Sequence, residues 1–212
     1  MHYGEWRGEH AKEHGILILG ESHHINKSTD PVAGVPASYT TEANMRDYLQ
    51  HPKGKSYRFF DKIVASFGLD PNEQRNEFWD KVYFGNYIPV LCGVRDRSAR
   101  NTLNAGNRET YNDQLFQFIN DHAIRTVFCF SVLAYGNLPS MADGESDTCN
   151  SLGMCGNRKI YLRHCLYRAD TPHAHTTVLL KQDLEVYGIQ HPSAPGGYHP
   201  EIYAAVLADQ FR

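Results

Sequence analysis

The stretch Ile16-Leu17-Ile18-Leu19-Gly20-Glu21-Ser22-His23-His24 decides the fold. Its aliphatic run ends at a glycine, which is typical of a buried strand whose carboxyl end opens into a loop. Near the other end of the chain, Val186-Tyr187-Gly188-Ile189 shortly precedes a second polar segment, His191-Pro192-Ser193. Ligands of open α/β sheets bind in the crevice beyond the carboxyl ends of the strands. We therefore expect the two polar segments to line one pocket.

The composition is that of an ordinary globular protein. The 212 residues are 41% hydrophobic and 21% charged, and this length suffices for a full core, so we expect one domain over residues 1–212. The net charge of −3 argues against nonspecific nucleic-acid binding by a broad basic surface, although a local basic rim remains compatible with it. The polar start and the lack of a long apolar run predict a cytoplasmic protein with no membrane contact and no obligate protein partner.

Hydrophobic spacing and turn residues predict alternating strands and helices, with long loops after residue 24, over residues 93–107 and over residues 136–158. The segment Thr176–Leu180 is compatible with either a strand or a helix. The alternation of strands and helices along the chain favours a parallel sheet with helices on both faces. The expected strands are residues 16–19, 81–86, 126–130, 159–167 and 186–189. The expected helices run from Thr40 or Thr41 to before Pro52, over Phe59–Phe67, from Asp70 through Trp79, over Tyr111–His122, and from Pro200 onward.

The five cysteines raise the question of a metal site. Cys149, Cys155 and Cys165 lie fairly close together, and His164 precedes the last of them. Their spacing lacks the Cys-x-x-Cys pair that structural zinc sites usually supply. We therefore expect no metal and no cofactor, with a cysteine-bound metal as the minor alternative.

Three motifs together resemble the uracil-DNA glycosylase superfamily. They are Gly20–His24 after the first strand, Asn86 at the end of the second, and His191–Ser193 after the last. The order of the motifs and the chain length agree with that family over nearly the whole sequence. The resemblance implies a three-layer α/β/α sandwich with a short, mostly parallel central sheet. It also implies a protein that hydrolyses the N-glycosidic bond of a damaged or deaminated base flipped out of DNA.

The residue types suit this chemistry. Breaking an N-glycosidic bond passes through an oxocarbenium-like sugar. A carboxylate near the sugar either stabilises this cation or activates a water that attacks it. Glu21 is the only acid in the first motif. The departing base carries negative charge on an oxygen, which the imidazole of His191 would stabilise. The amide of Asn86 offers both a donor and an acceptor to a pyrimidine edge. Glu21 and His191 are therefore the expected catalytic residues.

Other residues are expected to hold the substrate. Gly20, Ser22 and His23 belong to the first motif, and the resemblance implies that Ser193 contacts a phosphate of the extruded nucleotide. Base flipping also requires an aromatic platform, for which Tyr39 is the candidate. Three arginines of the loop over residues 93–107 are either solvated or in contact with the DNA backbone. They are Arg95, Arg97 and Arg100.

The sequence departs from the family at several positions. The best-known branch has Asp where Ser22 stands, and Glu21 resembles a second branch that carries four cysteines at a spacing not found here. The wedge residue expected after His-Pro-Ser is absent, with Tyr198 as the one nearby substitute. Purely structural roles are also compatible with these residues, because Glu21 is able to cap the segment that follows it and Asn86 is able to act as a turn residue.

Two other functions are compatible with these motifs. A non-catalytic nucleotide or nucleic-acid binder would keep the pocket without the reaction. A hydrolase of the Gly-Asp-Ser type would use Ser22 as nucleophile and His199 as base. The acid that orients the histidine in that family falls on Gly196 here, which disfavours the hydrolase.

Overall fold

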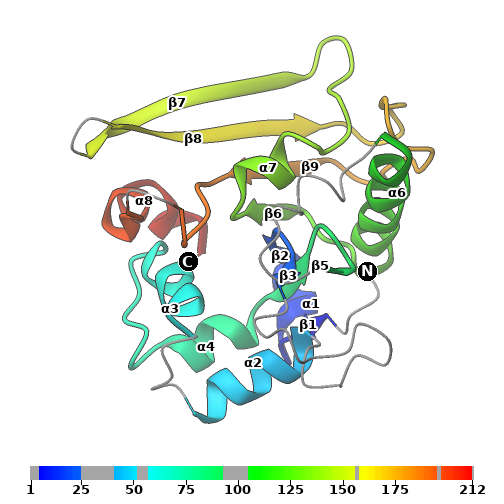
Figure 1. The fold of residues 1–212 in the computed structure, drawn as a ribbon. Coiled ribbons are helices and arrows are strands. Elements are labelled where there is room, and N and C mark those ends of the chain that lie inside the picture. The colour runs from blue at the N-terminus through cyan, green and yellow to red at the C-terminus, as the bar shows by residue number, and fades with distance from the viewer. Residues whose placement is uncertain are drawn as a thin grey trace.

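The computed structural model describes residues 5–24, 41–51, 57–92, 105–155, 158–194 and 197–211. They form an α/β fold around a seven-stranded mixed sheet of order β1-β4-β2-β6-β9-β8-β7, shown in Figure 1. A second sheet of two short strands, β3 and β5, lies apart from it. The strands of the main sheet are β1 Trp6–Arg7, β2 Ile16–Gly20, β4 Tyr83–Asn86, β6 Thr126–Cys129, β7 Ser146–Cys155, β8 Arg158–Tyr167 and β9 Leu184–Gly188, and those of the small sheet are β3 His23–His24 and β5 Leu91–Cys92.

The centre of the main sheet is parallel and its two margins are antiparallel. Strands β4, β2, β6 and β9 pair in parallel, whereas β1 pairs antiparallel with β4, and β8 pairs antiparallel with both β9 and β7. The expectation of a mostly parallel sheet therefore describes the central strands, and the sheet as a whole is mixed. The difference arises because β1 and β8 run against the central strands, and β7 in turn pairs antiparallel with β8.

The first predicted strand lies in the interior of this sheet, between β4 and β6, because both of its faces are apolar. All five residues of β2 are buried, as is typical of a parallel strand covered on two sides. Leu17 and Leu19 belong to one hydrophobic core, while Ile16 and Ile18 belong to another on the opposite face. Successive side chains of a strand point to opposite faces, so this single aliphatic run joins both cores.

Helices cover both faces of the sheet (Figure 1). Buried side chains of α6 and α7 share the core of Leu17 and Leu19, and those of α2, α3, α4 and α8 share the core of Ile16 and Ile18. No helix in the described ranges is long and apolar enough to cross a membrane. The helices are α1 Ala11–His14, α2 Thr41–Gln50, α3 Arg58–Ala65, α4 Arg75–Asp80, α6 Ala105–His122, α7 Val132–Tyr135 and α8 Pro200–Leu207, which continues into the 3₁₀ helix η3 Ala208–Phe211.

The predicted strands and most predicted helices are confirmed, but three sequence expectations are wrong. The segment 136–158 is not one long loop, because it contains the ten-residue strand β7. The helix expected from Asp70 begins only at Arg75, since Asp70 Oδ1 instead accepts a hydrogen bond from the backbone N–H of Asn72 in a turn. Residues 176–180 form neither a helix nor a strand.

Strands β7 and β8 form a long antiparallel arm, which Figure 1 shows extending along one margin of the molecule above α8. A buried carboxylate anchors its base. Glu145 accepts hydrogen bonds from the backbone N–H groups of Ala142 and Arg168, and its Oε1 lies 2.8 Å from Nε2 of His173. Burial alone would raise the pKa of Glu145, but these hydrogen bonds and the imidazole outweigh it and lower the pKa.

This lowered pKa predicts how stability depends on pH. Glu145→Gln should lower the free energy of unfolding at neutral pH by about 1 to 3 kcal/mol, because the charged acceptor is lost. A carboxylate with a depressed pKa stabilises the fold above its unfolded pKa, and this contribution is lost as the pH falls through the folded pKa. The difference from the wild type should therefore shrink as the pH drops below about 4.3. Urea denaturation at several pH values measures it, with the exposed substitution Glu73→Gln as control. A difference independent of pH would contradict the prediction.

Candidate site at the carboxyl ends of the parallel strands

The four parallel strands bring the predicted polar residues to one edge of the sheet. Asn86 is the last residue of β4, Glu21 follows β2, Ser131 follows β6, and His191 follows β9. Because these strands run in the same direction, their carboxyl ends lie at the same edge. The strands β2 and β9 are separated only by β6, so their ends are about 10 Å apart, two strand spacings.

A buried serine orients the carboxylate of Glu21. The hydroxyl of Ser131 donates to Oε2 of Glu21 over 2.6 Å and accepts from the backbone N–H of Ala134 over 3.1 Å. Ser131 is thus the N-cap of α7 as well as a fixed donor to the acid. The backbone of Glu21 is also held, since its carbonyl accepts from the N–H of Ile88. The chain after Glu21 continues into β3, so Glu21 does not cap a helix that follows it in the sequence. Its carboxylate instead accepts a hydrogen bond from Ser131, the N-cap residue of α7.

Gly20 and Asn86 face each other across the pairing of β2 and β4. A Cβ atom on Gly20 would collide with Oδ1 of Asn86, so only glycine allows the amide to lie there. Asn86 is 8% exposed, and its Nδ2 donates to Oγ1 of Thr41 over 3.5 Å. The same hydroxyl lies 2.8 Å from Nε2 of His23, so Thr41 joins the first motif to the end of the second strand.

The loop after β9 rests on α3. Nζ of Lys62 donates to the carbonyl of Pro192 over 2.6 Å. Within the loop, Nδ1 of His191 accepts from the backbone N–H of Ser193 over 3.1 Å. A neutral imidazole whose Nδ1 accepts a hydrogen bond carries its proton on Nε2. His191 is therefore held in the tautomer that donates from Nε2. The side chain of Ser193 is exposed, as a phosphate contact would require.

Phe59 is a site residue that the sequence did not reveal. Its half-buried ring on α3 lies 5.3 Å from the His191 ring and 6.5 Å from that of Phe84, centroid to centroid. Phe84 is on β4, two residues before Asn86, so Phe59 connects the late loop with the end of the second strand. In the sequence, Phe59 and its buried neighbour Phe60 both fit a helical core pattern, and nothing in that pattern separates them.

The other predicted residues have different surroundings. Tyr198 is 6% exposed, stacks on Tyr203 and hydrogen-bonds Ser66, so it packs in the core and does not serve as a wedge. Ser22 is half-buried between Glu21 and the first residue of β3. Nδ1 of His199 lies 2.9 Å from Oε1 of Glu201, so the acid beside this histidine comes from α8. Several candidates lie outside the described residues, namely Tyr39, Arg95, Arg97, Arg100 and Gly196.

The cysteines give little support to a metal site. Cys149 is exposed, and its partner across the β7–β8 pairing is Arg163. Cys165 is buried, and burial raises the pKa of its thiol to about 11, which disfavours the thiolate that a metal requires. The side chain of Cys155 lies outside the described residues. In the part of the chain that the structure describes, no group of three or more His, Cys, Asp or Glu side chains is placed to hold a metal ion.

The double role of Ser131 yields a prediction. Ser131→Ala should lower the free energy of unfolding by about 1 to 2 kcal/mol, because α7 loses its cap and Glu21 loses its donor. Ser131→Thr keeps the hydroxyl and should recover most of that loss. Urea denaturation of the three proteins measures both effects. Equal stability of the alanine variant and the wild type would show that the two hydrogen bonds do not contribute.

A scan against protein-family models and a search of curated proteins both find no match to this chain. Its function is therefore inferred from its own residues and contacts.

Proposed function

We propose that the protein is a uracil-DNA glycosylase-like enzyme that hydrolyses the N-glycosidic bond of a damaged or deaminated base flipped out of DNA. The central observation in support is that Glu21, Asn86 and the His191 loop all lie at the carboxyl edge of the parallel strands β2, β4 and β9. In this proposal the helices on the two faces of the sheet form the outer layers of a three-layer α/β/α domain, and the β7–β8 arm is an addition at one margin.

Glu21 acts on the sugar. As the bond between C1′ and the base nitrogen breaks, both bonding electrons leave with the base and positive charge develops on the sugar ring. The carboxylate of Glu21 stabilises this charge and orients a water that adds to C1′. The hydrogen bond from Ser131 fixes the direction of the carboxylate without protonating it. A preoriented carboxylate reduces the reorganisation that the reaction requires.

His191 and Asn86 act on the base. The departing base accumulates negative charge on an exocyclic carbonyl oxygen, to which the Nε2–H of His191 donates. Because Nδ1 accepts from the Ser193 amide, the proton of the neutral imidazole is carried on Nε2. The amide of Asn86 pairs with the hydrogen-bonding edge of the base. Because Asn86 is almost fully buried, a base with the wrong donors and acceptors would leave its amide without a partner and would bind less favourably. The ring of Phe59, next to His191, is a stacking surface in addition to Tyr39.

The reaction is tested with the purified full chain. It is incubated with oligonucleotides that carry uracil, hypoxanthine or xanthine, and abasic sites are then cleaved with alkali. We expect strand cleavage at one or more of these bases. Binding without release of any base would favour the non-catalytic nucleic-acid binder instead.

A single substitution separates catalysis from binding. Glu21→Gln keeps the shape and the hydrogen bond from Ser131 but removes the charge, so the rate of base release should fall by about 100-fold or more while oligonucleotide affinity persists. The matched control is Glu13→Gln, an exposed position on α1 before β2 and hence at the opposite edge of the sheet. An unchanged rate for Glu21→Gln would remove Glu21 from the mechanism.

A further inference from the structure

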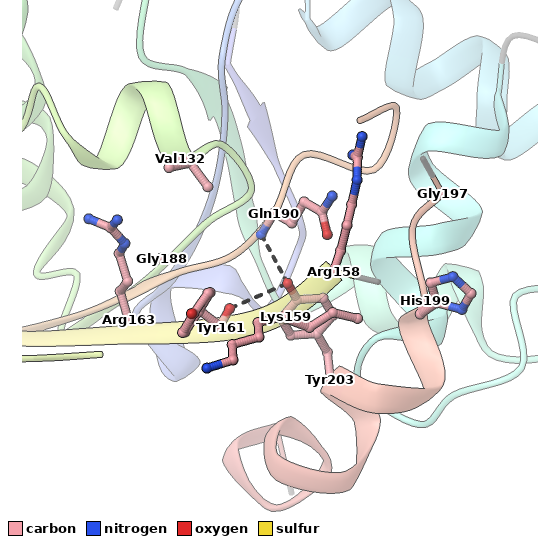
Figure 2. Close-up of a pocket in the computed structure, with 11 residues that line it drawn as sticks. Val132, Arg158, Lys159, Tyr161, Arg163, Gly188, Gln190, Gly197, His199 and Tyr203 are labelled. Atoms are coloured by element: carbon pink, nitrogen blue, oxygen red, sulfur yellow. Dashed lines mark hydrogen bonds between the residues drawn. The ribbon is translucent and has the colours of Figure 1, made fainter. Parts of the chain in front are cut away.

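A basic cavity adjoins the candidate site on the side of the arm. It has a volume of about 240 Å³ and lies between β8, the end of β9 and the start of α8. Val132 and Gln190 line it, and they directly follow Ser131 and directly precede His191. The lining therefore includes the immediate chain neighbours of Ser131 and His191. Figure 2 shows it with Arg163 and Lys159 on the β8 side and His199 on the α8 side.

The cavity exists because β8 extends past its neighbour. Arg163 of β8 pairs with Gly188, the last residue of β9, so Arg158–Leu162 continue beyond the carboxyl end of β9. Tyr203 closes the floor of this gap: its hydroxyl lies 3.3 Å from the backbone nitrogen of Gln190 and 3.4 Å from the carbonyl oxygen of Tyr161, as dashed lines show in Figure 2. The arm thus forms a wall along the edge where the polar motifs gather.

The wall is positively charged in a protein whose net charge is −3. Arg158, Lys159 and Arg163 all line the cavity. Within the described ranges, Lys159 and Arg163 take part in no ion pair, and Cζ of Arg163 lies 5.8 Å from the centroid of the Tyr135 ring. A carboxylate also lies beside the lining, since Oε1 of Glu201 on α8 is 2.9 Å from Nδ1 of His199. Three cations lining one cavity indicate an anionic ligand.

An exposed aromatic side chain accompanies these charges. Tyr161 is 44% exposed and stands between the cations on the same strand. Basic residues interleaved with an aromatic surface are typical of sites that follow a nucleic-acid strand, where phosphates meet the cations and a base stacks on the ring.

We propose that this cavity binds the sugar-phosphate backbone of the DNA strand next to the flipped nucleotide, with Lys159 and Arg163 on phosphates and Tyr161 stacked on an unpaired base. This extends the proposed function by naming the surface that holds the substrate strand. It makes single-stranded or locally opened DNA the preferred form, because a base can stack on Tyr161 only when it is unpaired.

The test measures binding separately from base release. A fluorescently labelled single-stranded oligonucleotide without a modified base is titrated with the full chain, and anisotropy is followed at several salt concentrations. The double substitution Lys159→Gln with Arg163→Gln should weaken binding and reduce the slope of log affinity against log salt by about 1 for each residue. Tyr161→Ala should weaken binding by about 5-fold or more without changing that slope.

The matched control is Lys12→Gln with Lys181→Gln. Both lysines are exposed and precede β2 and β9, so they lie at the opposite edge of the sheet, and the change in net charge is the same. This variant should keep the wild-type affinity and slope. Equal weakening by the two double variants would overturn the proposal, since the effect would then come from overall charge.

Further outcomes distinguish the proposed strand-binding site on β8 from the proposed glycosylase activity. If the wild type releases a base while the β8 variants bind normally, the glycosylase stands and the strand site is overturned. If no base is released but the β8 variants alone lose affinity, the strand site stands without the enzyme. A free 5′-mononucleotide that competes as well as the oligonucleotide would overturn the assignment to a polymer.

Discussion

The fold and the candidate site both depend on the parallel pairing of β2 with β4 on one side and β6 on the other. This pairing places Gly20 against Asn86 and brings Ser131, at the end of β6, next to Glu21. The aliphatic residues that bury β2 are immediately followed by the polar residues of the site. A one-residue slip of β2 would turn every side chain to the other face and separate the acid from its donor.

The central strands and the edge at which the motifs meet were predictable from the sequence. Residues 16–19, 126–130 and 186–189 are short apolar runs, and parallel strands buried on two faces need only that signal. The positions of Glu21, Asn86 and His191 at strand ends then follow from the chain order. Their partners do not, because Ser131 and Thr41 contact them from distant elements, and a single sequence carries no record of such contacts.

The arm escaped prediction for a physical reason. Most described side chains of β7 are exposed, so the strand needs no apolar alternation, and its glycine and polar residues resemble those of a loop. Its backbone pairing with β8 holds it in place instead. Phe59 was missed for the opposite reason: it shares the helical pattern of the core residues around it, and only the three-dimensional contact with His191 distinguishes it.

The outer margin of β7 has a consequence for self-association. Among the described strands β7 pairs with β8 alone, so one row of its backbone amides and carbonyls faces away from the sheet. Such an open margin invites strands from other molecules. The bulge between Ser151 and Gly153, where the glycine adopts a φ of 141°, breaks the regular spacing of that row. The irregularity protects a long, solvent-facing ribbon against edge-to-edge aggregation while leaving its basic partner strand accessible.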